Sequence, residues 1–168
     1  MIVTPSPWVV RFTPLVPTGS PVLDVACGRG RHTHWFLERG HPVTAVDRDL
    51  SGLRPRAGLT LVEADLEDGA PPPFAGQVFG GVVVTNYLYR PLLPALVAAV
   101  APGGVLLYET FAAGNEHLGR PSRPEFLLQR GELLEAVRGV LTVVAYEDLE
   151  VSEPRRAVVQ RIAAVRPC

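Results

Sequence analysis

The stretch VLDVACGRGRHTHWFLERGHPVTAVDRD, residues 22–49, constrains the fold of this chain more than any other feature. A short apolar run over 21–27 is bounded by turn-forming residues and predicts a strand buried on both faces. Two glycines follow, and residues 31–39 then predict a helix that a glycine ends. Residues 42–47 predict a second strand, which closes with an aspartate. This order of strand, glycine loop, helix and strand predicts one unit of a parallel sheet.

The remaining sequence repeats the alternation of strands and helices. A short helix or turn is expected at 49–54, and helices are expected at 90–101 and near 131–138, the first of them ended by Pro102-Gly103-Gly104. Further strands or strand-bearing segments are predicted at 59–65, 78–89, 105–111, 141–151 and 156–166. The predicted fold is therefore α/β: a doubly wound, mostly parallel, seven-stranded Rossmann-like sheet with a C-terminal antiparallel hairpin. We expect a single domain over 1–168, with an irregular N-terminal arm over the proline-rich residues 1–20.

Composition excludes several classes of partner and chemistry. All sixteen basic residues are arginine, so lysine Schiff-base and phosphate-loop chemistry are ruled out. The formal net charge of −1 argues against nucleic acid as a partner. The two cysteines lie far apart and form no metal-binding spacing, so no metal is expected. Prolines interrupt the most apolar run and no signal peptide is evident, so we expect no membrane partner and a cytoplasmic protein.

The glycine loop and the aspartate that follows it predict a cofactor containing adenosine. Gly28 and Gly30 allow a tight turn and a close approach of the backbone to a ligand. Asp47, nineteen residues after Gly28, can accept hydrogen bonds from ribose hydroxyls. The dinucleotide fingerprint requires a third glycine where this chain has Thr33. Asp24 would also repel a pyrophosphate but attract an ammonium group, so the pattern favours S-adenosylmethionine over NAD.

The stretch LDVACGRGRHTHWFLERGHPVTAVDRD resembles motif I and the following segment of class I S-adenosylmethionine-dependent methyltransferases. It is most similar to small bacterial members of the tellurite-resistance type, which share the CG-x-GR pattern. The resemblance continues through VEADLED, VVVTNYLYRPLLPAL and APGGVLLYETF, covers roughly residues 20–135, and implies a methyltransferase that binds S-adenosylmethionine. It says almost nothing about the acceptor.

The resemblance also implies a set of cofactor contacts. Asp24 is expected at the methionine end of the cofactor, Asp47 at the ribose, Asp65 at the adenine amino group and Asn86 near the transferring methyl group. The other expected contacts, in the loop and around the adenine, are Ala26, Cys27, Gly28, Gly30, Arg48 and Leu66.

Structural roles remain open for several of these residues. Asp24 could cap backbone amides, Asp65 could belong to a solvated turn, and Asn86 could satisfy its own backbone at a strand end. Cys27 is interpreted as a small buried residue rather than a nucleophile.

The acceptor site is expected at the ends of the fourth and fifth strands, between residues 86 and 123. Methyl transfer from a sulfonium mainly requires alignment and exclusion of water, so no catalytic triad is expected. Tyr87 or His117 is the candidate base. The expected partner is a small-molecule acceptor, together with a second copy of the chain if a homodimer closes the site. A cofactor-binding regulator without activity and an NAD-linked oxidoreductase remain the alternatives.

Overall fold

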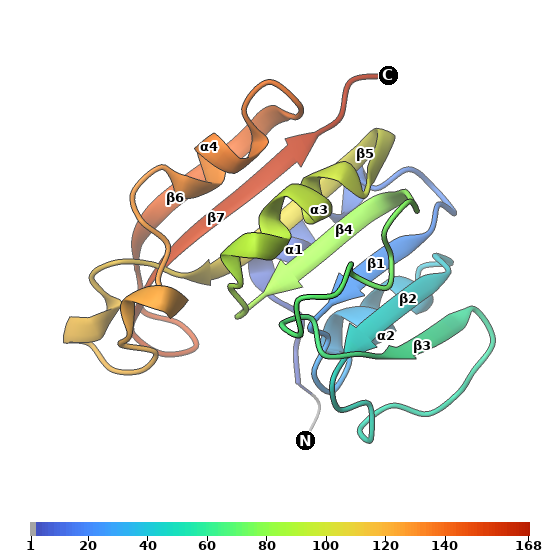
Figure 1. Cartoon of the computed structure of the whole chain (residues 1–168), viewed down its shortest axis with the longest axis horizontal. Coiled ribbons are helices and arrows are strands. Elements are labelled where there is room, and N and C mark those ends of the chain that lie inside the picture. The colour runs from blue at the N-terminus through green and yellow to red at the C-terminus, as the bar shows by residue number, and fades with distance from the viewer. Residues whose placement is uncertain (1–2) are drawn as a thin grey trace.

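A seven-stranded sheet organises residues 3–168, the part of the chain that the computed structural model describes (Figure 1). The strand order is β3-β2-β1-β4-β5-β7-β6, with β7 antiparallel to both of its neighbours and the other pairs parallel. The strands are β1 (Val22–Val25), β2 (Val43–Asp47), β3 (Leu59–Glu63), β4 (Phe79–Thr85), β5 (Val100–Phe111), β6 (Thr142–Val151) and β7 (Ala157–Val165). The predicted fold class, including the antiparallel hairpin at the C-terminal end, is confirmed.

The strand order reverses at β1, which pairs with β2 on one side and with β4 on the other. In an open parallel sheet, a reversal of this kind leaves a crevice beyond the carboxyl ends of the two central strands. The loops over 26–30, 48–53, 64–70 and 86–89 lie at that end of the sheet.

Short helices cover both faces of the sheet. They are α1 (Pro7–Phe12), α2 (Arg31–Leu37), α3 (Leu93–Ala98) and α4 (Glu132–Val137), with 3₁₀ turns η1 (Thr13–Leu15), η2 (Arg90–Leu92), η3 (Asn115–His117) and η4 (Pro124–Phe126). No helix among residues 3–168 is long and apolar enough to cross a membrane.

The expectation of an irregular arm over residues 1–20 was wrong for the described part of that segment. Ser6 caps α1 by accepting a hydrogen bond from the backbone N–H of Trp8, and Pro7 occupies the first helical position, where no N–H is needed. Trp8, Val9 and Phe12 are buried against the sheet. The prolines in this segment therefore obscured the pattern of a short helix in the sequence.

The expected end of the helix before β5 was also wrong. Helix α3 ends at Ala98, and Pro102-Gly103-Gly104 lie within β5 rather than terminating the helix. The pairing of β4 with β5 shifts register between Phe79 and Gly81, and this irregularity accommodates the extra residues. The continuous parallel pairing of β5 with β4, which runs to the carboxyl end of β4, begins at Val105.

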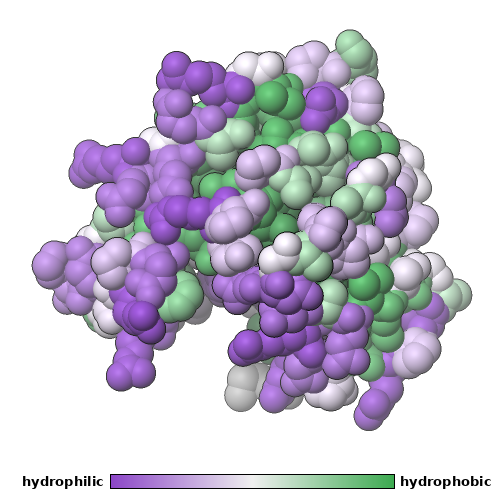
Figure 2. Space-filling model, viewed as in Figure 1, coloured by the Kyte–Doolittle hydropathy of each residue, from purple (hydrophilic) through white to green (hydrophobic). Residues whose placement is uncertain are grey.

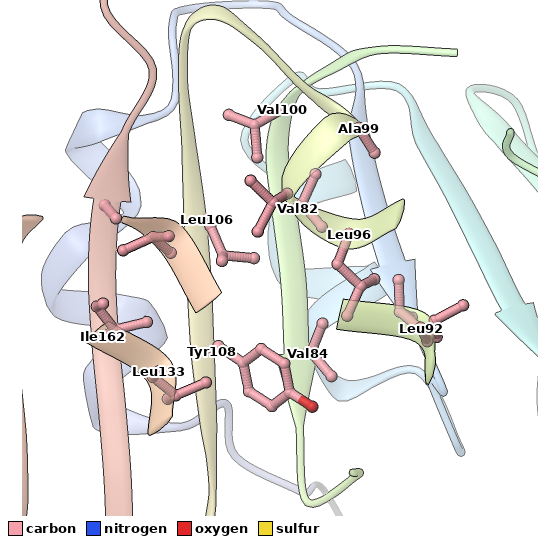
Figure 3. Close-up of a cluster of buried hydrophobic side chains, with 14 of the residues drawn as sticks. Val82, Val84, Leu92, Leu96, Ala99, Val100, Leu106, Tyr108, Leu133 and Ile162 are labelled. Atoms are coloured by element: carbon pink, nitrogen blue, oxygen red, sulfur yellow. The ribbon is translucent and has the colours of Figure 1, made fainter. Parts of the chain in front are cut away.

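The two larger apolar cores lie on opposite faces of the sheet. Helices α1 and α2 cover one of them, centred on Trp8, Phe36 and Val83. On the other face, η2, α3 and α4 cover a larger core around Leu96, Leu106 and Tyr108 (Figure 3). The Tyr108 hydroxyl donates a 2.7 Å hydrogen bond to the Tyr87 carbonyl, which ties this core to the segment after β4.

Candidate functional site

The loop between β1 and α2 contains three left-handed residues at alternate positions. Ala26, Gly28 and Gly30 have φ angles of 52°, 56° and 84°. A residue with a Cβ atom in this conformation costs roughly 1–2 kcal/mol, and Ala26 bears that cost here. Among residues 3–168, the other left-handed residue that is not glycine is Asn86, with φ 53°, directly after β4. Both therefore lie at the carboxyl ends of adjacent central strands, where such strain commonly marks a functional site.

The two glycines of the loop are needed for different reasons. A Cβ atom at Gly30 would lie 2.3 Å from Leu53 Cδ2, so this position is small because the loop packs against the segment after β2. A Cβ atom at Gly28 would meet no protein atom within 4 Å, and Gly28 is exposed. Only Gly28 therefore has the open side that a ligand could approach.

Asp47 connects the end of β2 to the glycine loop. Its Oδ2 atom accepts a 2.8 Å hydrogen bond from the Gly28 N–H, and Oδ1 accepts a 3.1 Å hydrogen bond from the Asp49 N–H. A carboxylate has about four acceptor sites, so roughly two remain for a ligand. The side chain is half-buried, which leaves those sites accessible from the crevice.

Asp24 lies beneath the loop rather than on its surface. The residue is 2% exposed, and its Oδ2 atom accepts a 2.7 Å hydrogen bond from the Thr33 hydroxyl. Burial raises the pKa of Asp24 to about 7, although hydrogen bonds from Thr33 and the nearby charge of Arg31 act in the opposite direction. Thr33, which replaces the third glycine of a dinucleotide fingerprint, is thus the hydroxyl donor to this carboxylate.

The other residues expected around the cofactor differ in accessibility. Cys27 is buried, and its burial raises the pKa of the thiol, in agreement with a structural interpretation. Arg48 and Asp65 are exposed, and Asp65 accepts a 2.9 Å hydrogen bond from the Glu67 N–H as part of a local turn. Leu66 is half-buried against the larger core. Contacts of these residues with a cofactor remain predictions.

The two candidate bases, Tyr87 and His117, have different surroundings. Tyr87 is half-buried, and burial together with the neighbouring acids Glu67 and Asp65 raises its pKa. Its phenol therefore stays protonated at neutral pH, which opposes a role as a base. The His117 side chain is 81% exposed on η3, with its nearest acidic group, the Glu116 carboxylate, at 3.6 Å. A catalytic role for either residue remains a prediction.

Sequence reasoning missed the contacts that hold the N-terminal segment against the loop. The Ser6 N–H donates a 3.0 Å hydrogen bond to His32 Nε2, and the Ser6 hydroxyl donates a 2.7 Å hydrogen bond to Glu109. Burial lowers the pKa of His32 to about 3, with a further contribution from Arg31, so the ring is a neutral acceptor. No signal in the sequence identifies Ser6 as the partner of His32.

A row of polar side chains crosses the sheet at the level of the site. Thr85, Glu109, Arg161 and Glu147 are direct partners on β4, β5, β7 and β6. Arg161 makes ion pairs of 2.9 Å with Glu109 and 2.6 Å with Glu147, and its guanidinium lies 4.9 Å from the centre of the Trp8 ring. This row and α1 form a wall on one face of the sheet, near the carboxyl ends of β4 and β5.

A separate groove lies away from the glycine loop. An apolar groove of about 570 Å³ runs between α3 and α4, where Figure 2 shows hydrophobic surface beside charged residues. Its lining includes Leu93, Val97 and Val140 but none of the residues predicted for the cofactor. Within residues 3–168 there is also no group of three or more His, Cys, Asp or Glu side chains that could hold a metal ion.

Comparisons with solved structures identify the fold. The chain superposes on TehB from Haemophilus influenzae with a TM-score of 0.70 and 17% identity, covering 96% of this chain and 61% of that one. A second match is the 1,6-didemethyltoxoflavin-N1-methyltransferase of Burkholderia thailandensis, solved with its substrate and S-adenosylhomocysteine. There the TM-score is 0.67 at 21% identity, with 96% and 77% of the chains covered. The chain has the fold of class I S-adenosylmethionine-dependent methyltransferases. The predicted resemblance to class I S-adenosylmethionine-dependent methyltransferases is confirmed at the level of the fold.

Three curated methyltransferases show sequence similarity. A malonyl-[acyl-carrier protein] O-methyltransferase of Serratia marcescens is 33% identical over 106 residues, 58% of this chain and 40% of the relative. A trans-aconitate 2-methyltransferase of Delftia acidovorans is 27% identical over 158 residues, 83% and 58% of the two chains. A ribosomal RNA small subunit methyltransferase A of Anaeromyxobacter dehalogenans is 31% identical over 159 residues, 82% and 50%. This methyltransferase-fold chain thus spans about half the length of its curated relatives, and no protein-family model matches it.

Proposed function

We propose that the protein is an S-adenosylmethionine-dependent methyltransferase that transfers a methyl group in line to a small-molecule acceptor. The observation that carries this proposal is the arrangement of carboxylates around the open side of the glycine loop. Asp47 is hydrogen-bonded to Gly28, Asp24 lies beneath the loop, and the acids after β3 lie close enough to raise the pKa of Tyr87.

These residues fit a sulfonium cofactor better than a dinucleotide. A dinucleotide pyrophosphate would bring negative charge against Asp24, whereas an ammonium group brings positive charge; Asp47 could accept hydrogen bonds from the ribose of either cofactor. The open side of Gly28 leaves room for the ligand at the switch point of the sheet. The compared structures support the same choice, since the Burkholderia enzyme was solved with S-adenosylhomocysteine.

Each expected contact has a place in this proposal. Asp47 would accept hydrogen bonds from the ribose hydroxyls with the acceptor sites that the backbone leaves unused. Asp24 would act from beneath the loop, through its charge or through water, since its side chain is buried. Arg48, Asp65 and Leu66 would surround the adenine, and Asn86 would lie near the methyl group. Ala26, Cys27, Gly28 and Gly30 would shape the loop beneath.

The chain itself contributes alignment and exclusion of water. S-Adenosylmethionine, when bound, supplies a methyl group that is already activated for displacement. The protein must hold the acceptor in line with that group and keep water out. We infer that Asn86 and Tyr87, which follow β4, do this together with the wall formed by α1 and the polar row. The protonated Tyr87 phenol can donate a hydrogen bond to an acceptor.

The wider biological setting is also part of the proposal. We infer a single domain acting in the cytoplasm, an acceptor smaller than a nucleic acid, and a second copy of the chain as the partner that completes the enclosure of the site. The near-neutral charge supports the inference on the acceptor, and two of the compared enzymes are named for the small molecules 1,6-didemethyltoxoflavin and trans-aconitate.

A turnover assay tests the function. The protein is incubated with S-adenosylmethionine and separate panels of carboxylic acids, phenols, amines and thiols, and S-adenosylhomocysteine is quantified by mass spectrometry. The proposal predicts formation of S-adenosylhomocysteine that depends on one acceptor class and falls at least tenfold in Asp47→Ala. Binding of the cofactor with no turnover on any panel would favour a regulatory protein instead.

A further inference from the structure

Two loops lie beyond the carboxyl ends of β4 and β5, where the acceptor is expected (Figure 1). One comprises residues 112–126, after β5, and the other comprises residues 152–156, between β6 and β7. The buried side chain of Asn115 joins the first loop to the start of β7. Its Nδ2 atom donates a 2.9 Å hydrogen bond to the Pro121 carbonyl, and its Oδ1 atom accepts a 3.0 Å hydrogen bond from the Val158 N–H. The two loops therefore have a defined arrangement relative to each other.

Arg155, in the second loop, contacts both the first loop and the end of β5. Its Nη2 atom donates a 2.7 Å hydrogen bond to the Arg120 carbonyl, and its guanidinium lies 5.6 Å from the centre of the half-buried Phe111 ring. These contacts orient the guanidinium, and the hydrogen bond uses one of its five N–H donors. The side chain is exposed, so the remaining donors are open to a ligand.

Neighbouring arginines differ from Arg155 because they have carboxylate partners. Arg156 forms an ion pair with Glu150 of β6, and Arg123 forms a 2.6 Å ion pair with Glu125. Arg155 forms no ion pair within residues 3–168, and the groups that hold it are neutral. An oriented guanidinium without an acid can bind an incoming carboxylate through two parallel hydrogen bonds.

The other acids of the two loops are not partners of Arg155. Glu116 accepts a 2.7 Å hydrogen bond from the Gly114 N–H and lies 3.6 Å from His117. Glu153 forms no ion pair in the described part of the chain. The two loops together contain four arginines and three glutamates, so they produce no strong positive field. This balance favours a small anion, recognised by its hydrogen bonds, over a polyanion.

The surroundings of Tyr87 and His117 favour an acceptor without a proton to lose. Burial and the neighbouring acids raise the pKa of Tyr87, and the His117 side chain is 81% exposed. A phenol or an ammonium group must lose a proton when it is methylated, whereas a carboxylate is already ionised at neutral pH. A carboxylate acceptor therefore needs no base from this chain.

Arg155 is separated from the cofactor loop by several strands. The second loop joins β6 to β7, which lie on one side of β5, whereas β4 and β1 lie on the other side. Neighbouring strands are about 4.8 Å apart, so β7 and β4 are separated by roughly 10 Å. An acceptor held by Arg155 must extend across the end of β5 to reach a methyl group near Asn86. The group that Arg155 binds therefore differs from the group that is methylated.

We propose that Arg155 binds one carboxylate of a dicarboxylic acid and that the second carboxylate of this acceptor receives the methyl group. The inference rests on the proposed function and names its acceptor class. An oxygen of the second carboxylate forms a bond to the methyl carbon as the bond from that carbon to sulfur breaks, and the electron pair of the broken bond stays on sulfur. The products are a methyl ester and S-adenosylhomocysteine, and no proton is released.

Turnover of matched acids tests this inference. Succinate, glutarate and adipate are compared with monocarboxylates of the same chain length, and S-adenosylhomocysteine and the methyl ester are quantified by mass spectrometry. We expect kcat/KM for at least one dicarboxylate to exceed that for its matched monocarboxylate by about tenfold or more. Arg155→Met should lower this value by about tenfold or more through KM and leave the monocarboxylate unchanged. Arg155→Lys should retain part of the preference because it keeps the charge.

Arg156→Met is the matched control, because it removes the adjacent arginine and the same charge. It should leave KM for the dicarboxylate within about twofold of wild type, and both variants should bind S-adenosylhomocysteine as wild type does, which shows that they are folded. Turnover of phenols, amines or thiols but of no dicarboxylate would overturn the inference and leave the proposed function standing, as would equal effects of Arg155→Met and Arg156→Met. Absence of turnover with every acceptor class would contradict the proposed function itself.

Discussion

The carboxylate of Asp47 accepts a 2.8 Å hydrogen bond from the backbone N–H of Gly28, nineteen residues earlier in the chain. This contact holds the ribose-type acid of β2 against the glycine loop that follows β1. The two sequence features that predicted an adenosine cofactor are therefore parts of one structural unit. The hydrogen bonds within this unit leave free acceptor positions on the Asp47 carboxylate, and the open side of Gly28 remains accessible to a ligand.

Substitution of the two loop glycines should separate stability from binding. Gly28→Ala is expected to cost about 1–2 kcal/mol of stability, because only its left-handed backbone is strained. Gly30→Ala should cost more, because its Cβ atom would also lie 2.3 Å from Leu53 Cδ2. Gly28→Ala should nevertheless weaken S-adenosylhomocysteine binding at least tenfold, because its Cβ atom enters the open side. Chemical denaturation and calorimetry measure the two effects, and a larger loss of stability for Gly28→Ala would contradict this account.

Asp24 should make the folded protein less stable as the pH rises. Its pKa is raised by burial to about 7 from the ordinary value of 3.8, so the unfolded chain loses this proton first. The free energy of unfolding therefore falls from about pH 4 to about pH 7. Asp24→Asn does not titrate, and its stability relative to wild type should improve over this window by on the order of 4 kcal/mol. Urea unfolding at pH 4 and pH 7.5 measures this; parallel pH profiles for the two proteins would show that Asp24 is ionised in the folded state.

His32 should have the opposite effect. Its pKa is lowered by burial to about 3 from 6.5, so below pH 6.5 the unfolded chain gains a proton that the folded chain does not. The stabilisation is complete above pH 6.5 and is lost as the pH falls toward 3. His32→Gln keeps an acceptor for the Ser6 N–H but does not titrate. Between pH 7 and pH 5 the wild type should lose about 2 kcal/mol more than this variant in urea unfolding. An equal loss of stability in both proteins would mean that a group other than His32 takes up the proton.

The ion pair between Glu109 and Arg161 should matter more than a surface pair. Their side chains are 14% and 20% exposed, and Glu109 also accepts the Ser6 hydroxyl bond. Glu109→Ala should therefore cost about 1–3 kcal/mol, since it leaves two polar groups without this partner. The matched control is Glu135→Ala, whose partner Arg138 is 76% exposed and whose loss should cost less than about 0.5 kcal/mol. If both substitutions lower the free energy of unfolding by the same amount, the ion pair of Glu109 contributes no more to stability than a surface pair.

The strands and the cofactor loop could be predicted because their signals are local. Apolar runs, turn residues and the spacing from Gly28 to Asp47 each lie within a short stretch of chain. Helix α1 was missed because prolines dominated the interpretation of residues 1–20, although Ser6-Pro7 followed by buried Trp8 and Val9 is a usual helix start. The C-terminal end of the helix before β5 was predicted at the wrong residues, because Pro102-Gly103-Gly104 is compatible with a β-bulge as well as with a helix end.

The wall of the site could not be predicted because it depends on strand register. Glu109 and Arg161 lie fifty-two residues apart and meet only because β5 and β7 pair in one alignment. Sequence spacing carries no record of such alignments, so the glycine loop and its contact with Asp47 were open to prediction and the polar row was not.

Calorimetric titration of the full chain with S-adenosylhomocysteine and, separately, with NAD tests the central claim most directly. We expect micromolar binding of S-adenosylhomocysteine, at least tenfold weaker binding in Asp47→Ala, and no measurable heat with NAD. No binding of S-adenosylhomocysteine at millimolar concentration, or binding of NAD in its place, would contradict the assignment of the cofactor.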